Sequence, residues 1–312
     1  MFKYVVTKEN KYFNIKELLK IHYDMSDKLI AKLKKHKRIF KNNNPVYVTE
    51  TLNLNDIIEI DLDFYEESDN ILPTAKDIEV IYEDEYMLIV NKEPGFPVHP
   101  TSTHLDDTLS NFVKFYFEKN NIKRKIRPVN RLDKDTSGLV IFAKSDYIQD
   151  ILIKQMEKNI FSKKYFAILE NIPSPLSGKI DAPIARKPNS IIERMISFEY
   201  DQKLGKDYIP QNATTIYDTK KIYDDSTIKL ALVEFKLLTG RTHQIRLHSK
   251  YINCPLLGDD LYNKESDLIN RQALHSFEIS FIHPIKKEQV IYAAPIPKDM
   301  ENVLNSFNFK IV

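Results

Sequence analysis

Cysteine is almost absent from this sequence of 312 residues, which contains a single one, Cys254. One cysteine excludes an internal disulfide framework and a zinc site built from several cysteines. Glycine is also scarce, with six residues, so positions with unusual backbone freedom are few and each glycine merits inspection. No apolar run approaches the length of about 18 residues that a transmembrane helix needs. The start of the chain lacks the long apolar core of a secretory signal, and a cytoplasmic protein is therefore expected.

Several short motifs that bind or transfer small groups are missing as well. The chain has no glycine-rich phosphate loop, no GxSxG turn and no GxGxxG fingerprint. These absences argue against a phosphotransferase, a serine hydrolase and a dinucleotide enzyme. No nucleotide cofactor is expected.

The composition that remains is that of an ordinary globular protein. Apolar residues make up 42% and charged residues 29% of the chain, and its length suggests one large domain with a smaller one. The net charge of +2 is small. Any nucleic-acid site must therefore arise from where the charges sit, because the total says little.

The first 64 residues read as a small unit, 1–64. The spacing of apolar residues predicts one helix in "NIKELLKIHY" and a second helix that begins after Ser26, a suitable N-cap. A short strand, a loop and a closing strand at Ile57 to Leu62 are expected to follow. The predicted order is helix, helix and then small strands.

The charge reverses sign along this unit. The segment Lys28 to Lys41 contains seven Lys or Arg and no acid, whereas Asp56 to Asp69 contains seven acids and no base. A lysine-rich helix is often only a solvated surface, but a helix that contacts a polyanion needs the same charges. Charge alone leaves both interpretations open.

Residues 65–77 carry acids, a proline and few large apolar side chains, which is typical of a linker. Alternating apolar and polar residues then predict two strands before a turn around Pro94 to Pro97, and a helix is predicted at roughly Thr108 to Lys119. The segments "IKLALVEFKLLTG" and "QVIYAAPI" are strand-like. Residues 78–312 are therefore predicted to form a mixed domain rich in antiparallel strands, so the fold class is α+β.

One polar cluster, "RLDKDTSG" at 131–138, runs directly into the apolar segment Leu139 to Ala143. Gly138 allows a backbone conformation closed to other residues, and Thr136 can hydrogen-bond local backbone groups. Such rigid support is what a reactive carboxylate at Asp133 would need. The alternative is an ordinary capped turn, in which Asp133 and Asp135 accept from nearby amides.

A second candidate is Tyr165 in "FSKKYFAILENI", where it lies within a probable strand. A tyrosine in such a run commonly fills the core. The functional alternative is a ring placed against a planar substrate, with its hydroxyl available for proton chemistry.

The third candidate is the segment "TGRTHQIRLH" at 239–248, which concentrates arginine, histidine, glutamine and threonine side chains. So many donors are costly unless they meet an anionic partner or a buried acid. His243 and His248 do not match the spacing of a helical zinc motif and no third ligand is obvious, so no metal site is predicted. A surface ion-pair network is the alternative.

Taken together, these segments resemble the RluA family, the pseudouridine synthases of the ribosomal large-subunit type. The family pattern Arg-Leu-Asp-x-x-Thr-Ser-Gly is matched at 131–138, Lys-x-Tyr at 163–165 and Thr-Gly-Arg-x-His-Gln-Ile-Arg-x-His at 239–248. The flanking stretches "APIAR", "CPLLGDDLY" and "RQALHSFEISFIHP" fit as well. The resemblance covers about residues 78 to 300 in the order of the family.

The resemblance implies that uridine is converted to pseudouridine in RNA, most of all in large-subunit ribosomal RNA, without a metal or another cofactor. It implies that Asp133 is the catalytic carboxylate, that Arg246 pairs with it and keeps it ionised, and that Tyr165 stacks on the uracil. Arg241 is the alternative partner of Asp133. The substrate-binding residues that it implies are Arg131, Thr136, Arg241, His243, Gln244 and Lys163.

Residues 1–64 resemble the α-L RNA-binding module first described in a small-subunit ribosomal protein. This resemblance implies that the basic second helix and its end meet RNA, through Lys28, Lys32, Lys35 and Arg38. RNA is therefore the expected partner. No membrane association is expected, and a monomer is the default expectation.

Two positions depart from the family pattern. Asn130 stands where many relatives carry histidine, and Lys92-Glu93-Pro94-Gly95 replaces the usual Lys-Pro-x-Gly. Both departures bear on fine positioning only.

Three other functions deserve comparison with an rRNA synthase. They are a transfer RNA pseudouridine synthase, a non-catalytic RNA-binding or ribosome-assembly protein on the same fold, and a glycosidase that uses Asp133 and Asp135. The glycosidase is disfavoured because two carboxylates so close in one tight loop do not flank a bond from opposite faces.

Overall fold

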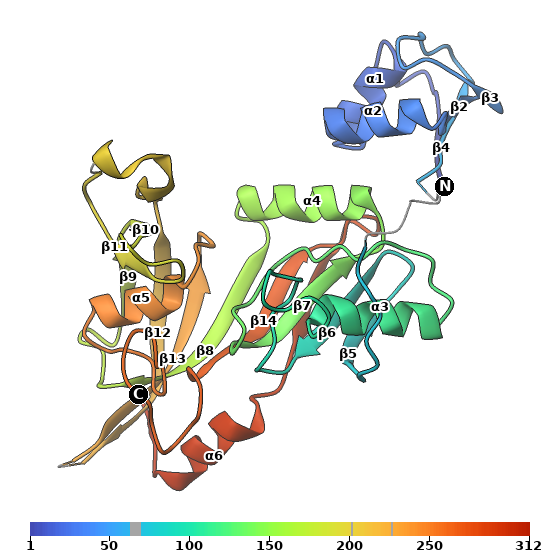
Figure 1. Ribbon diagram of the computed structural model, residues 1–312. Coiled ribbons are helices and arrows are strands. Elements are labelled where there is room, and N and C mark those ends of the chain that lie inside the picture. Colours follow the sequence, from blue (N-terminus) through green and yellow to red (C-terminus); the bar gives the residue numbers. More distant parts are fainter. Residues whose placement is uncertain (63–69, 201, 226) are drawn as a thin grey trace.

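We describe the fold from a computed structural model, which describes residues 1–62, 70–200, 202–225 and 227–312 (Figure 1). The predicted linker at 65–77 falls partly on residues 65–69, which lie outside the described residues. Residues 63–64 of the predicted 1–64 unit lie outside them as well.

The N-terminal unit contains two short helical segments and a small antiparallel sheet. Its elements are β1 (Phe2–Val5), α1 (Ile15–Glu17), the π-helical turn η1 (Leu18–His22), α2 (Asp27–Lys35), β2 (Ile39–Lys41), β3 (Asn44–Pro45) and β4 (Ile57–Ile60). The strand order is β1-β4-β2-β3. The Ser26 side chain accepts from the backbone N–H of Leu29 and caps α2, as its sequence position predicts. Both helices and the closing strand are confirmed, whereas β1 was not predicted.

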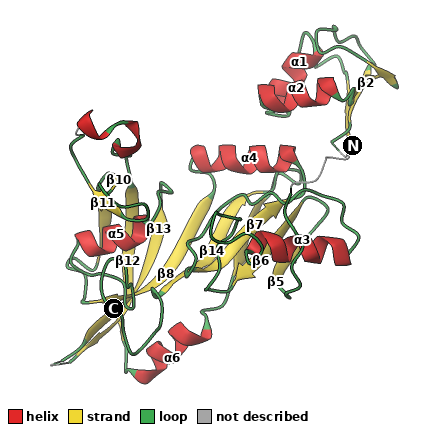
Figure 2. Cartoon of the chain, in the orientation of Figure 1, coloured by secondary structure: helices red, strands yellow, loops and turns green. Residues whose placement is uncertain are grey.

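The larger unit is built on a ten-stranded sheet with the order β16-β12-β13-β8-β14-β7-β6-β5, to which β15 adds beside β14 and β9 beside β12. Its strands are β5 (Glu79–Glu83), β6 (Met87–Lys92), β7 (Ser137–Ala143), β8 (Ser162–Glu170), β9 (Ser177–Asp181), β12 (Thr214–Asp224), β13 (Lys229–Leu237), β14 (Leu274–Ile282), β15 (Gln289–Ala293) and β16 (Lys310–Ile311). Figure 2 shows β12, β13, β8, β14, β7, β6 and β5 side by side in this order. The mainly antiparallel α+β fold is confirmed.

Smaller elements surround this sheet. A separate hairpin consists of β10 (Ile184–Arg186) and β11 (Arg194–Ile196), and two 3-10 turns follow, η2 (Gln202–Leu204) and η3 (Lys206–Tyr208). The helices are α3 (Leu109–Lys119), α4 (Asp146–Glu157), α5 (Gln244–Tyr251) and α6 (Lys298–Ser306). The predicted helix from Thr108 is confirmed, with Thr108 as the N-cap of α3.

The strand that receives the candidate aspartate loop is β7, an interior strand whose seven residues are all buried. β7 pairs antiparallel with β6 along its length and parallel with the start of β14, through His275 and Ser276. A strand buried on both faces reads as a continuous apolar run, as Leu139 to Ala143 does. The candidate aspartate loop enters the sheet at this parallel junction.

The N-terminal unit packs on α4, which lies between that unit and the sheet (Figure 1). Tyr147 and Ile148 of α4 share one apolar cluster with Leu29 and Leu33 of α2. The Phe2 and Tyr147 rings meet edge to face with centroids 5.1 Å apart. No helix in the described ranges has the length and apolar character needed to cross a lipid bilayer.

Candidate active site

A cavity of about 690 Å³ opens where the loop before β7 faces the start of α5. Its volume lies in the range of small-molecule and nucleotide sites. All nine residues predicted for catalysis or substrate binding line this cavity, although they come from distant parts of the sequence. They are Arg131, Asp133, Thr136, Lys163, Tyr165, Arg241, His243, Gln244 and Arg246.

The loop that carries Asp133 is tied to the edge of β7. The Asn130 amide donates to the carbonyl of Leu139 at 2.9 Å and accepts from the backbone N–H of Ile141 at 2.9 Å. The backbone N–H of Thr136 donates to the carbonyl of Asp133 at 3.1 Å and closes the turn. Asn130, a departure from the family pattern, thus holds the loop by satisfying two strand groups that have no neighbouring strand.

Two buried basic side chains also hold the backbone directly after Asp133. Lys92 Nζ donates to the carbonyls of Lys134 and Thr136 at 2.8 and 2.9 Å, and Arg271 Nη1 donates to the carbonyl of Asp135 at 3.1 Å. Burial lowers the pKa of Lys92 to about 7. Lys92, at the end of β6, and Arg271, which precedes β14, therefore fix three successive backbone carbonyls of the loop. These contacts hold rigid the backbone that follows Asp133.

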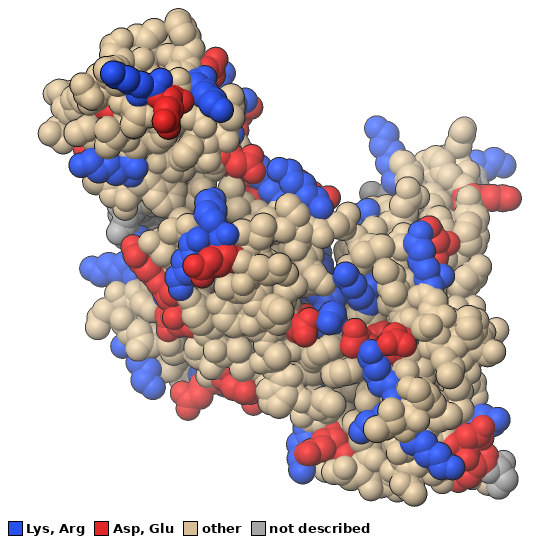
Figure 3. All heavy atoms as spheres, turned by 180° about the vertical axis from the view of Figure 1, so that it is seen from behind, with Lys and Arg blue, Asp and Glu red and all other residues tan. Residues whose placement is uncertain are grey.

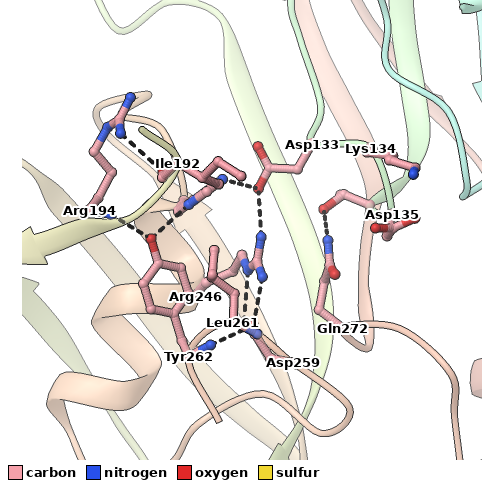
Figure 4. Close-up of polar contacts among 12 residues, drawn as sticks. Asp133, Lys134, Asp135, Ile192, Arg194, Arg246, Asp259, Leu261, Tyr262 and Gln272 are labelled. Carbon is pink, nitrogen blue, oxygen red and sulfur yellow. Dashed lines mark hydrogen bonds and ion pairs between the residues drawn. The ribbon is translucent and has the colours of Figure 1, made fainter. Parts of the chain in front are cut away.

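The Asp133 carboxylate faces α5, while Asp135 lies on the other side of the loop (Figure 4). Asp133 Oδ2 lies 3.8 Å from Arg246 Nη1 and 3.9 Å from His243 Nε2. The Asp133 side chain is 29% exposed and the Arg246 side chain is 7% exposed. Asp133 is therefore the more accessible member of the pair, and Arg246 lies buried behind it.

Asp133 is not the principal partner of Arg246. Arg246 Nε and Nη2 donate to the two carboxylate oxygens of Asp259 at 2.8 and 2.6 Å, and Asp259 is fully buried. Bidentate pairing leaves Nη1 as the group directed at Asp133. The alternative partner is not brought to Asp133, because Arg241 is exposed and its Nε donates to the carbonyl of Asn212.

The electrostatics of this cluster keep the arginine charged. Burial acts to lower the pKa of Arg246, but the hydrogen bonds and charge of Asp259, together with Asp133, outweigh it and raise the pKa. The buried Asp259 therefore stabilises the Arg246 cation that contacts Asp133.

Tyr165 and Lys163 enter the cavity from neighbouring positions of β8. The Tyr165 ring is 5% exposed, and burial raises the pKa of its phenol, with the negative charge of Asp133 adding to the effect. Tyr165 is therefore a neutral phenol at physiological pH. Burial lowers the pKa of Lys163.

Gln244 uses its hydrogen-bonding groups within the protein. Its carbonyl oxygen accepts from Thr239 Oγ1 and the backbone N–H of Arg241, and its amide donates to Thr214 O and Thr215 Oγ1. All four positions of the amide are occupied, so the side chain supports the loop before α5 instead of presenting a donor to the cavity. Arg131, in contrast, is exposed at the cavity rim.

The module residues predicted to meet RNA fall into two groups. Lys28 and Lys35 are exposed on α2. Lys32 forms an ion pair with Asp146 of α4, and Arg38 Nη1 forms one with Asp61 at 2.6 Å. On the face shown in Figure 3, Lys and Arg side chains are interspersed with Asp and Glu over both units, so contacts with a polyanion depend on local groups.

Lys92, Asp259 and Tyr262 are among the residues that support the site and that sequence reasoning missed. The Tyr262 ring lies under the Arg246 guanidinium at 5.1 Å, and its hydroxyl lies 2.8 Å from His243 Nδ1. Their only signal in the sequence was their place in the flanking stretches "CPLLGDDLY" and Lys92-Glu93-Pro94-Gly95.

The arrangement suits chemistry at a carbon that gains positive charge. A partly exposed carboxylate faces a cavity, its position is fixed by backbone contacts, and a charged arginine lies behind it. Such a carboxylate can stabilise or trap an oxocarbenium-like centre. Among the described residues, no group of three or more histidine, cysteine or acidic side chains is arranged to hold a metal ion.

Comparisons with known proteins show the family to which the chain belongs. Residues 86–251 match the family model for RNA pseudouridylate synthases. "Uncharacterized RNA pseudouridine synthase YhcT" of Bacillus subtilis is 34% identical over 93% of this chain and 92% of its own length. "Ribosomal large subunit pseudouridine synthase D" of Zymomonas mobilis is 36% identical over 72% of this chain and 71% of its own length.

The fold also has a match among solved structures. The human protein "RNA Pseudouridylate Synthase Domain Containing 1" superposes with a TM-score of 0.61, at 22% identity, over 77% of this chain and 92% of that one. At this identity the likeness concerns the fold alone.

Proposed function

The chain belongs to the RNA pseudouridylate synthase family and is an RNA pseudouridine synthase, and from this premise we propose that Asp133 is its catalytic carboxylate and large-subunit ribosomal RNA its target. The observation that carries the proposal is the contact of the Asp133 carboxylate with Arg246 at 3.8 Å on the wall of the cavity.

The isomerisation explains the need for one carboxylate. The bond between N1 of uracil and C1′ of the ribose breaks, a bond between C5 and C1′ forms, the C5 proton leaves and N1 gains a proton. No electrons are lost or gained overall, so the reaction needs no redox partner. Asp133 meets the positive character that develops at C1′ when the first bond breaks.

The other cavity residues have supporting roles in this proposal. Tyr165 stacks on the uracil and takes part, directly or through water, in removing the C5 proton. Arg246 orients Asp133 and balances its charge. Arg131, exposed at the rim, helps to fill the space that the extruded nucleotide leaves, because the reacting atoms are hidden inside stacked RNA.

The remaining residues predicted to bind substrate have two different proposed roles. Thr136, His243, Lys163 and Arg241 lie on the cavity wall and remain proposed contacts to the nucleotide or its phosphates. Gln244 is instead proposed to position the loop before α5, because its amide is fully used within the protein.

The proposed target rests on two lines of support. A relative 36% identical is named a ribosomal large subunit synthase. Residues 1–64 resemble an RNA-binding module, and the exposed Lys28 and Lys35 on α2 offer charge to a phosphate backbone. We further propose the boundaries 1–64, 65–77 and 78–312, and a cytoplasmic monomer that acts on RNA without a nucleotide cofactor.

Tritium release tests the proposed target. The protein is incubated with large-subunit ribosomal RNA and, separately, with transfer RNA, each carrying tritium at C5 of uridine. We expect release from the ribosomal substrate and background release from transfer RNA. The reverse result would assign the protein to transfer RNA.

Mapping in cells separates the enzyme from a binding protein on the same fold. Pseudouridine is mapped in total RNA from cells with and without the protein. Loss of specific large-subunit positions is expected in its absence, whereas an unchanged map would favour a ribosome-assembly role.

A further inference from the structure

His243 occupies an unusual backbone position beside Asp133. It directly precedes α5 with φ of +58°, in the left-handed region that residues with a side chain rarely adopt. Such a conformation persists only where surrounding contacts hold it, and it is found at functional sites. Here it places the imidazole between two groups, Asp133 on the cavity side and Tyr262 behind it.

The Tyr262 hydroxyl connects this imidazole to the β11 strand. Its oxygen accepts from the backbone N–H of Arg194 at 2.8 Å, and it lies 2.8 Å from His243 Nδ1 (Figure 4 labels Arg194 and Tyr262). Within the described ranges, the hydroxyl proton has no acceptor other than His243. The O–H of Tyr262 is therefore directed at Nδ1, which must carry a lone pair.

This contact determines which nitrogen of the neutral ring holds the proton. If Nδ1 is an acceptor, the proton of neutral imidazole sits on Nε2. Nε2 is the nitrogen that faces Asp133 Oδ2 at 3.9 Å. The opposite tautomer would point an Nε2 lone pair at a carboxylate oxygen and leave the Tyr262 proton without an acceptor.

The charges around the ring agree with a neutral form. Burial lowers the pKa of His243, and the positive charges of Arg246 and Arg194 lower it further. The negative charge of Asp133 acts to raise it. Asp259 behind Arg246 acts in the same direction as Asp133. The ring is thus a neutral donor with its N–H at the cavity.

We propose that Tyr262 is a positioning residue that holds His243 as the neutral Nε2–H tautomer, and that this N–H is a hydrogen-bond donor to the reacting base beside Asp133. The proposal rests on the proposed function. Negative charge moves onto the uracil when its bond to C1′ breaks, and a fixed neutral donor in a buried site stabilises such charge.

Imidazole nitrogen NMR on the whole protein labelled with ¹⁵N-histidine tests the tautomer without any turnover. Loss of one signal pair in a His243→Gln variant assigns His243. We expect an unprotonated Nδ1 and a protonated Nε2 in the wild type, and a mixture of tautomers in Tyr262→Phe. A protonated Nδ1 in the wild type would overturn the proposal.

Kinetics of Tyr262→Phe test its consequence. The phenyl ring still packs under Arg246, but the hydroxyl contacts to His243 and to the backbone N–H of Arg194 are lost. We expect kcat to fall about five- to tenfold with little change in KM, which is the worth of one hydrogen bond. The acid limb of the kcat profile should move to higher pH, because the lost hydrogen bond favoured the neutral ring.

Tyr217→Phe is the matched control. Tyr217 is also buried, and its hydroxyl donates to the carbonyl of Pro175 in another part of the sheet. The control should leave both kcat and the acid limb unchanged. An acid limb that does not move in Tyr262→Phe would contradict the proposal, even if kcat falls.

Two substitutions of His243 distinguish the role of Nε2 from that of Nδ1. The amide of His243→Gln reaches the place of Nε2, whereas that of His243→Asn reaches only the place of Nδ1. We expect Gln to retain more activity than Asn, and equal loss in both would contradict the proposal. A wild type that releases no tritium from any RNA would instead remove the proposed function, leaving the NMR result to stand by itself.

Discussion

At the scale of single residues, the site is a chain of charges that begins deep in the protein and ends at the cavity. The buried Asp259 accepts from Nε and Nη2 of Arg246 and also from the backbone N–H of Tyr262 at 3.0 Å. Arg246 is thereby oriented with Nη1 toward Asp133. A buried charge is tolerated only when it is paired, so each member depends on the one behind it.

Removing the deep acid should therefore be costly. Asp259→Asn leaves Arg246 as a buried cation without its bidentate anion, and we expect unfolding to become easier by about 3 kcal/mol or more in urea titrations. The adjacent Asp260→Asn is the control, because that side chain is 74% exposed and lies 3.9 Å from Arg246. Its effect should stay within about 0.5 kcal/mol. Equal effects of the two variants would show that the buried pair is not what stabilises this region.

The sequence indicated which residues line the cavity better than it indicated the residues that support them. Asp133, Tyr165 and Arg246 stand in three compact patterns, and the structure brings them to one cavity. Asp259 and Tyr262 follow Arg246 by 13 and 16 positions in a loop, and no local pattern reveals that this loop folds back. The choice of Asp259 over Asp133 as the tight partner of Arg246 depends on burial, which sequence does not display.

At the scale of elements, the critical joint is the parallel contact between β7 and β14. Gly138 takes φ of +115° there, and a Cβ at this position would lie 2.2 Å from the carbonyl oxygen of Ser276. The strands approach so closely that only a residue without a side chain fits. The same joint carries the loop of Asp133 into the sheet.

Two glycine substitutions distinguish close approach from backbone strain. Gly138→Ala should destabilise the fold by more than about 4 kcal/mol or prevent folding, because the clash is with backbone. Gly95→Ala is the control, since Gly95 has φ of +101° but open space around it. It should cost only about 1–2 kcal/mol of strain, measured by the same denaturation. A Gly138→Ala variant as stable as Gly95→Ala would contradict the close packing.

Elements were predicted well where the sequence period was clear. The helix at Thr108 to Lys119 and the strand segments of β13 and β15 have the periodicity and caps expected of them. β1 was missed because a strand of four residues offers too few alternating positions to distinguish it from a loop.

At the scale of the whole molecule, the N-terminal unit is attached to α4 by apolar and ionic contacts. Lys32 pairs with Asp146, which also accepts from Arg127 Nε at 2.6 Å, and the backbone N–H of Ser26 donates to Asp150. This docking, which no sequence pattern indicates, directs one of the predicted RNA-binding lysines toward the larger unit. Lys28 and Lys35 remain exposed on α2.

Salt dependence of RNA binding tests which lysines meet phosphate. Lys28→Ala and Lys35→Ala should each lower affinity for every RNA tested and reduce the slope of log K against log salt by about 0.7–0.9. Lys298→Ala is the control, because α6 lies at the opposite end of the molecule from the N-terminal unit (Figure 1). An unchanged slope in both α2 variants would show that α2 is a solvent-exposed surface that does not contact the RNA phosphates.

Tritium release by Asp133→Asn tests the catalytic carboxylate most directly, with Asp135→Asn as a matched control in the same loop. Asp135 carries the same acid, but its side chain lies on the other side of the loop from Arg246 (Figure 4). We expect Asp133→Asn to bind RNA with wild-type affinity and to release tritium only at background, while Asp135→Asn remains active. Turnover retained by Asp133→Asn would contradict the assignment of Asp133 as the residue that breaks and remakes the nucleoside bond.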